Sequence, residues 1–251
     1  MAKQESINEM KGTIGNLTFY KTKNGYKVRR KSSISKQTIM TSPRFLATRQ
    51  NMAEFGNAGK AGKAFRNSIR PLLNSAKDSF MISRFLKVMR QIIATDTVNT
   101  RGNRIVAKGA ITLLKGFNFN IESPLESNFT APYVASINRG TGILKVDIPS
   151  FLPNTYLNAP AGATHFKIVT SSCEMDFQNQ NGVTDNLETA PLACDNNLTA
   201  AISHVHNATA GSTLPLFLLM GIHFYQKVNG IYYPLKSQAS NSLGVIEVDN
   251  S

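Results

Sequence analysis

Two Asn-Gly pairs constrain the fold more than any other feature of this sequence. Asn24-Gly25 lies between the stretches LTFYKTK and YKVRRKS, and Asn229-Gly230 lies between FYQKV and IYYPL. Both pairs tolerate the positive φ angles of a type I′ turn, whose twist matches that of paired strands. The sequence therefore predicts an antiparallel β-hairpin near each end of the chain.

The first hairpin is expected to carry positive charge on both faces. A two-residue loop would pair Lys23 with Tyr26, Lys21 with Val28 and Phe19 with Arg30. The two faces would then consist of Phe19, Lys21, Lys23, Tyr26, Val28 and Arg30, and of Thr18, Tyr20, Thr22, Lys27, Arg29 and Lys31. Neither face is apolar enough to form a core, and an isolated two-stranded ribbon is marginal in water. We expect the hairpin to rest on helices of its own chain, a neighbouring subunit or a polyanion; a solvated hairpin without a ligand is the alternative.

A first helix is predicted to begin at Ser42-Pro43, since Ser suits the N-cap and Pro the first helical position. Three glycines follow in its second half, at positions 56, 59 and 62. Glycine costs about 1 kcal/mol relative to alanine inside a helix. The segment is therefore either one helix that needs close packing or two helices with a break between them.

A second helix is predicted within the stretch PLLNSAKDSFMISRFLKVMRQIIATD. Its apolar face is expected to hold Phe85, Met89 and Ile92, with Phe80 and Ile82 nearby. The remaining surface carries Lys77, Arg84, Lys87 and Arg90. This basic side is either a solvated surface or a part of the same cationic surface as the hairpin.

Charge is divided unequally along the chain. Residues 1–110 hold 22 Lys and Arg against 5 Asp and Glu, and residues 111–251 hold 6 against 10, so the net charges are +17 and −4. Such asymmetry is typical of proteins that contact nucleic acid or an anionic surface. We therefore expect a basic region of hairpin and helices at 1–110 and a separate domain at 111–251.

The second region has the pattern of an antiparallel β-sandwich. Short apolar runs without intervening helices favour an α+β chain that ends in a jelly-roll or Ig-like sandwich. The stretch 183–213 is polar and is expected to be a long loop with a short helix near 197–205. Strands are expected at 112–121, 131–138, 142–148, 164–170, 173–177, 214–228, 231–236 and 243–249.

No motif predicts catalysis, a cofactor or a metal. A zinc site needs three or four converging ligands, and nothing in the spacing of His165, His204, His206 and His223 brings them together, although His204 and His206 would share a strand face. Cys173 and Cys194 are too few for a disulfide scaffold and are expected to be reduced, although a bond between them stays open. The apolar run LPLFLLMGIHFY is too short to span a bilayer. We see no secretory signal, and we expect the protein in the cytoplasm or within an assembled particle.

The first half also resembles a known family. The stretches KGTIGNLTFYKTKNGYKVRRK and SPRFLATRQNMAEFGNAGKAGKAFR, with the later LLKGFNFN and PAGATHF, are similar to short proteins of Bacteroidetes-type bacterial genomes for which no activity is established. The resemblance implies a bacterial or phage-derived origin and no particular reaction. The layout of a basic N-terminal region before a β-sandwich is similar, more loosely, to that of small viral coat proteins.

Two functions fit these observations. The first is a non-enzymatic, self-assembling structural protein whose basic half binds nucleic acid or bridges subunits; the second is a monomeric surface- or carbohydrate-binding sandwich that reads its ligand with the 179–213 loop. We expect the first. Aromatic rings that alternate with cations suit nucleic acid, because rings stack on bases and cations meet phosphates. The residues expected to contact nucleic acid are Lys21, Lys23, Lys27, Arg29, Arg30, Lys31, Arg84 and Lys87.

Overall fold

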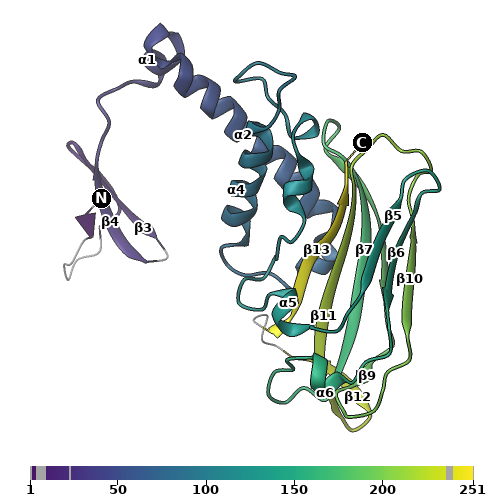
Figure 1. Cartoon of the computed structure of the whole chain (residues 1–251). Coiled ribbons are helices and arrows are strands. Elements are labelled where there is room, and N and C mark those ends of the chain that lie inside the picture. The colour runs from purple at the N-terminus through teal and green to yellow at the C-terminus, as the bar shows by residue number, and fades with distance from the viewer. Residues whose placement is uncertain (1, 4–9, 23, 236–239, 251) are drawn as a thin grey trace. The chain divides into compact units, whose positions relative to one another are not determined.

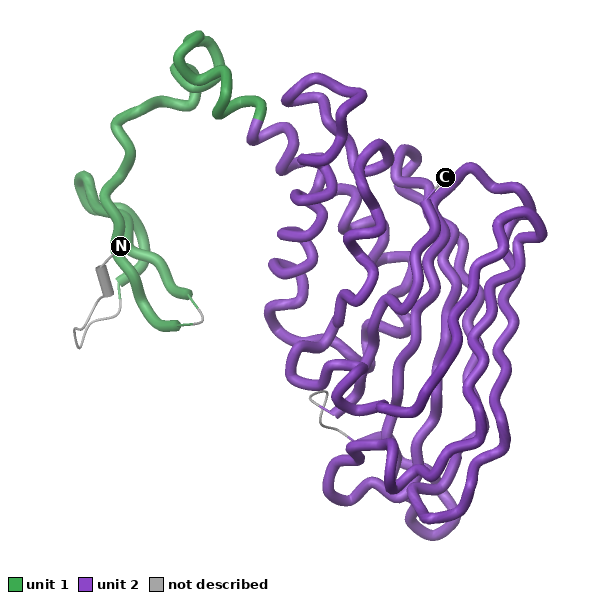
Figure 2. The backbone as a smooth tube through the Cα atoms, in the orientation of Figure 1, with its two compact units in different colours: residues 1–50 green, residues 51–251 purple. Residues whose placement is uncertain are grey.

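A computed structural model describes residues 2–3, 10–22, 24–235 and 240–250. The chain combines helices with antiparallel sheets, which confirms the α+β class (Figure 1). It divides into two compact units, residues 1–50 (unit 1) and residues 51–251 (unit 2), shown in green and purple in Figure 2.

Unit 1 is built on a four-stranded antiparallel sheet in the order β1-β4-β3-β2. The expected hairpin is present as its two central strands. The strands are β1 (Ala2–Lys3), β2 (Gly12–Ile14), β3 (Leu17–Thr22) and β4 (Gly25–Arg30).

The register of the hairpin differs from the predicted one by two residues. Lys21 pairs with Tyr26, Phe19 with Val28 and Leu17 with Arg30. The last pair before the turn is Thr22 with Gly25, whereas a loop at Asn24-Gly25 would make Lys23 and Tyr26 the last pair. The Thr22 hydroxyl donates to the Gly25 carbonyl at 2.8 Å. Because strand side chains alternate with a period of two, this even shift keeps each residue on its predicted face.

Two helical segments follow the sheet. Helix α1 (Lys36–Thr41) is capped by Ser35, whose hydroxyl accepts from the Thr38 N–H at 3.0 Å. A 3-10 turn η1 (Pro43–Phe45) then leads directly into α2 (Leu46–Ser68), so the helical start predicted at Ser42-Pro43 is confirmed.

Helix α2 is continuous through its glycines, which decides between the two alternatives for this segment. Gly62 is the glycine that needs close packing. A Cβ atom there would lie 3.4 Å from the ring of Phe85 and 3.5 Å from Met89 Cγ on α4 (Met81–Ala94). Gly56 and Gly59 have open space around the same position.

Helices α2 and α4 cover one face of a six-stranded sheet (Figure 1). Phe85, Met89 and Ile92 of α4 are buried as predicted, whereas Phe80 and Ile82 are 59% and 58% exposed and do not join the core. The remaining short helical segments are α3 (Arg70–Leu73), η2 (Val106–Lys108), η3 (Ile111–Leu114), α5 (Leu125–Asn128) and α6 (Pro153–Tyr156).

Two sheets make up the rest of unit 2. A three-stranded sheet has the order β10-β6-β5, and the larger sheet has the path β12-β11-β7-β8, with β13 beside β11 and β9 beside β7. The strands are β5 (Val134–Asn138), β6 (Ile143–Ile148), β7 (His165–Asp176), β8 (Asn181–Glu188), β9 (Leu192–Ala193), β10 (Ile202–Asn207), β11 (Leu216–Val228), β12 (Ile231–Pro234) and β13 (Ser242–Asp249).

Strand β11 is apolar from Leu216 to Ile222 because both of its faces are buried there. Phe217 and Leu219 belong to the core between this sheet and the helices, where the ring centroid of Phe217 lies 4.8 Å from that of Phe65 on α2. Leu216, Leu218, Met220, Ile222 and Phe224 point the other way, into a second core that also contains inward side chains of β6. The central strand of the large sheet therefore serves two cores.

The domain boundary expected at residue 110 differs from the boundary between the compact units. Phe65 and Phe85, from the helices, share one core with Cys173 and Phe217, from strands of the second half. Helices α2 and α4 thus pack with the sheet, and the units meet at residue 50.

Three of the element predictions for the second half are wrong. The segment 112–121 is not a regular strand, because η3 fills its start and Gly116 turns with φ +80°; its remainder only borders β13, where the Phe119 N–H donates to the Leu243 carbonyl. Much of the expected loop 183–213 is strand, in β8 and β10, and no helix forms at 197–205. The strands expected at 164–170 and 173–177 are one strand, β7.

Candidate polyanion-binding surface

The sheet of unit 1 has two unlike faces. Cross-strand partners lie on the same side of a sheet, so the observed register places Ile14, Leu17, Phe19, Tyr26 and Val28 on one face, with Lys21 and Arg30 at its ends. We call this the apolar face. The other, the basic face, presents Thr13, Thr18, Tyr20, Thr22, Lys27 and Arg29.

Cations on both faces lie over aromatic rings. Lys21 Nζ is 5.1 Å from the ring centroid of Tyr26, and Arg29 Cζ is 5.7 Å from that of Tyr20. Such pairing holds the cation near the sheet without neutralising its charge. A polyanion could therefore meet both the charges and the rings.

Carboxylates are absent from this part of the sequence. From Met10 to Ala53 the chain contains ten Lys and Arg residues and no Asp or Glu. The described part of unit 1 thus offers no acidic side chain of its own to its cations. Their charge is left to counterions or to a partner.

The predicted contact residues fall into two groups. Lys21, Lys27, Arg29, Arg30 and Lys31 belong to unit 1, and Lys21, Arg29, Arg30 and Lys31 are exposed while Lys27 is half-buried. Arg84 and Lys87 belong to α4 in unit 2. Lys23 lies outside the described residues.

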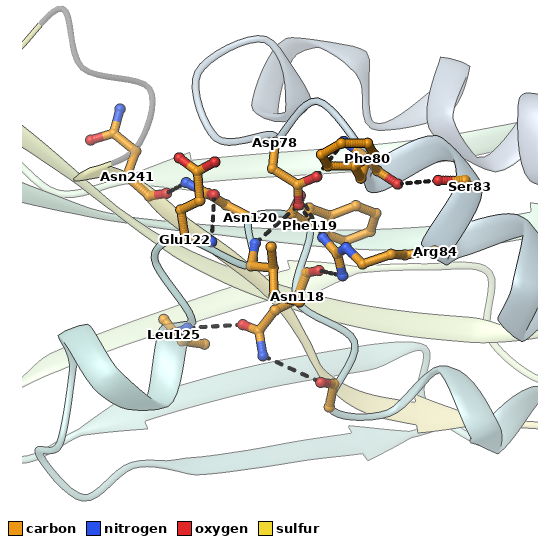
Figure 3. Close-up of polar contacts among 12 residues, drawn as sticks. Asp78, Phe80, Ser83, Arg84, Asn118, Phe119, Asn120, Glu122, Leu125 and Asn241 are labelled. Carbon is orange, nitrogen blue, oxygen red and sulfur yellow. Dashed lines mark hydrogen bonds and ion pairs between the residues drawn. The ribbon is translucent and has the colours of Figure 1, made fainter. Parts of the chain in front are cut away.

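Arg84 has a structural role, which makes it unsuited to the contact predicted for it. It forms an ion pair with Asp78 and donates from Nη1 to the Asn118 carbonyl at 2.8 Å (Figure 3). Its guanidinium also lies 5.2 Å from the ring centroid of Phe117. Asp78 is almost completely buried, and although burial alone would raise its pKa, hydrogen bonds from the Ile121 N–H and Arg84 hold that pKa below its ordinary value.

Lys87 is exposed, as are most cations of the segment 51–110. All three carboxylates of this segment are used inside the fold. Glu54 accepts from the Gly102 N–H, Asp78 pairs with Arg84, and Asp96 accepts from the N–H groups of Val98, Asn99 and Ile105. The solvent-facing side of the helices is therefore cationic.

The structure joins two of the histidines in a polar cluster that the sequence did not indicate. Thr170 Oγ1 on β7 lies 2.7 Å from His204 Nδ1 and 2.8 Å from His206 Nε2, both on β10. Asp185 Oδ2 on β8 lies 3.3 Å from His206 Nδ1, without the alignment of a hydrogen bond. The carboxylate favours a proton on His206 Nδ1, so Nε2 accepts from the Thr170 hydroxyl, whose oxygen accepts from His204 Nδ1. The cluster links the two sheets.

The cluster is a buried structural contact between the sheets, because His206 and Thr170 are both buried. Burial lowers the pKa of His206 and of His204, so both are held neutral. His165 and His223 lie apart from it on the large sheet, where His223 Nε2 contacts Ser75 Oγ at 2.9 Å. Among the described residues no three His, Cys, Asp or Glu side chains are grouped to hold a metal ion.

Both cysteines are free thiols. Burial raises the pKa of Cys173 to about 12 and that of Cys194 to about 11, so neither is a thiolate at neutral pH. Their surroundings are those of packed side chains.

Comparison with protein-family models, with curated proteins and with solved structures gave no match. Within the described residues, no helix combines the length and the apolar character needed to cross a bilayer.

Proposed function

We propose that this chain is a non-enzymatic structural protein that assembles with itself, and that unit 1 is its polyanion-binding module, with nucleic acid as the partner. Unit 2 is the assembling body, whose two sheets form a β-sandwich of the jelly-roll or Ig-like kind. The observation that carries the proposal is the run of ten cations without a carboxylate, part of which lies in a sheet that holds two of them over tyrosine rings.

Binding of this kind depends on phosphates and little on base sequence. Each cation that meets a phosphate releases a counterion, so log affinity falls with log salt by about 0.9 per duplex phosphate neutralised. Tyr20 and Tyr26 add rings on which unpaired bases can stack. The module is therefore expected to bind many sequences, with a steep dependence on salt.

The second candidate, a carbohydrate-binding sandwich, depends on a loop at 179–213 that binds the sugar. Asn181–Glu188 and Ile202–Asn207 of this segment are strands of the two sheets, so the candidate loses that loop. The sugar-binding alternative also gives the cations of unit 1 no role.

The test is the salt dependence of duplex DNA binding by the full chain and by Lys27→Ala/Arg29→Ala, which removes two cations of the basic face. The variant should flatten the log–log slope by about 2 units if each cation meets a phosphate. Lys115→Ala/Lys145→Ala is the matched control, because both lysines sit in the second half and pair with carboxylates. An unchanged slope in the first variant, or an equal loss in the control, would refute the assignment.

A further inference from the structure

The sheet of unit 1 lacks a core of its own. Over residues 10–22 and 24–50 no side chain is buried, and Ile14 and Leu17 on the apolar face are 63% and 44% exposed. Small sheets gain stability only when an apolar face is covered. We therefore expect another protein surface to cover the apolar face of unit 1.

Charge limits which surface that partner can be. Unit 1 holds 11 Lys and Arg against 2 Glu, and the helical segment 51–110 is also strongly basic, with 11 against 3. Residues 111–251 are acidic, with 6 against 10. Like charges repel at close contact, so the acidic second half fits the sheet of unit 1 and the helices do not.

One described surface of the second half suits a sheet. The outward side of β10-β6-β5 presents mostly short side chains, and it includes Val134, Ile143 and Val205, which are 64%, 41% and 44% exposed. Its two charged residues on β6, Lys145 and Asp147, pair with each other at 2.9 Å. It is a sheet face whose two β6 charges neutralise each other, and sheets pack face to face on such surfaces.

We infer that the apolar face of unit 1 packs on the outward face of β10-β6-β5 in a second copy of this chain. This inference rests on the proposed structural role and names the two surfaces that assembly uses. The contact joins unlike surfaces, so each copy offers one donor sheet and one acceptor sheet, and copies can add in series or close into a ring. The basic face of unit 1 stays available for the polyanion.

The experiment measures mass by light scattering on nuclease-treated full-length protein over a range of micromolar concentrations. Wild type should form oligomers. Phe19→Ser/Val28→Ser (donor variant) and Val134→Lys/Val205→Lys (acceptor variant) should each be monomeric. The acceptor variant changes exposed positions of unit 2 and leaves the sheet of unit 1 intact, so its result stands even where the donor variant unfolds unit 1.

Mixing the two variants gives the sharper result. The donor variant keeps a working acceptor, and the acceptor variant keeps a working donor, so the mixture should form a one-to-one complex that grows no further. Three results would each overturn the inference. The wild type stays monomeric, or the acceptor variant still assembles, or the mixture forms no complex although the donor variant retains its native circular dichroism.

Failure of the polyanion proposal is separate. Lys27→Ala/Arg29→Ala changes only the basic face, so it should flatten the salt dependence of DNA binding and keep the wild-type mass. If this variant is monomeric in the nuclease-treated sample, assembly uses the basic face and the proposed sheet contact is overturned.

Discussion

His223 gives the protein a defined sensitivity to acid. Its side chain is mostly buried on the central strand β11, beside Ser75, and burial lowers its pKa to about 4, although the Glu188 carboxylate opposes that shift. In the unfolded chain a histidine titrates near 6.5. Below that pH, His223 binds a proton in the unfolded chain but not in the folded chain. The free energy of unfolding therefore falls as the pH drops from about 6.5 toward 4.

The size of this effect follows from the difference between the two pKa values. One pKa unit corresponds to about 1.4 kcal/mol, so His223 should cost the fold about 3 kcal/mol between pH 6.5 and pH 4. His223→Gln keeps an amide nitrogen within reach of Ser75 and removes the titration. It should be the less stable protein at pH 7.5 by about 1 to 2 kcal/mol, through poorer packing and hydrogen bonding, and should lose that disadvantage as the pH falls.

Urea unfolding at pH 7.5, 6.5, 5.5 and 4.5, followed by far-ultraviolet circular dichroism because the chain has no tryptophan, measures both curves. His165→Gln is the control, since His165 is only half-buried and should change the pH dependence less. Parallel curves for wild type and His223→Gln would refute the conclusion that His223 is buried in its neutral form.

Five further substitutions, in three sets, test other parts of the structure. Thr170→Val removes the hydroxyl between His204 and His206 and leaves a buried ring nitrogen without a partner, so urea unfolding at pH 7.5 should show a loss of about 2 to 4 kcal/mol. Arg84→Met leaves the buried Asp78 carboxylate unpaired and should cost about 3 to 5 kcal/mol, whereas Lys87→Met on the same helix should change stability by less than about 0.5 kcal/mol. Gly59→Ala has open space and should raise stability by up to about 1 kcal/mol, while Gly221→Ala would place a Cβ atom 2.5 Å from the Ser242 carbonyl oxygen on β13 and should lower the melting temperature.

Local patterns predicted the elements that depend on neighbouring residues. The helical start at Ser42-Pro43, the buried stripe of Phe85, Met89 and Ile92, and the turn at Asn229-Gly230 are present as expected. Each depends on capping, periodicity or turn chemistry within a few residues.

The failures depend on contacts between distant residues. Strand β10 directs His204 and His206 inward, where the Thr170 hydroxyl hydrogen-bonds one ring nitrogen of each, whereas the polar sequence alone predicts a loop there. Arg84 looked like a surface cation because its partners, Asp78 and the carbonyl of Asn118, belong to segments that only the fold brings together. For the candidate site, the sequence indicated the cations of unit 1, but the separation into a basic and an apolar face required Ile14 and Leu17 to pair across β2 and β3.

The position of β11 in the chain has a consequence for biosynthesis. This strand completes both cores, yet it is made after α2 and α4, so the contact between Phe65 on α2 and Phe217 forms only after the helices have been made. Contacts between such distant residues make folding slow, and apolar surface exposed in the meantime favours aggregation. In a nascent chain that ends before Leu216, the apolar sides of α2 and α4 should therefore be exposed to chaperones. Unit 1, whose strands pair locally, has already left the ribosome by then. Ribosome-bound chains stalled with β11 inside and outside the exit tunnel should differ in protease resistance over residues 51–215, with protection gained only once β11 has emerged.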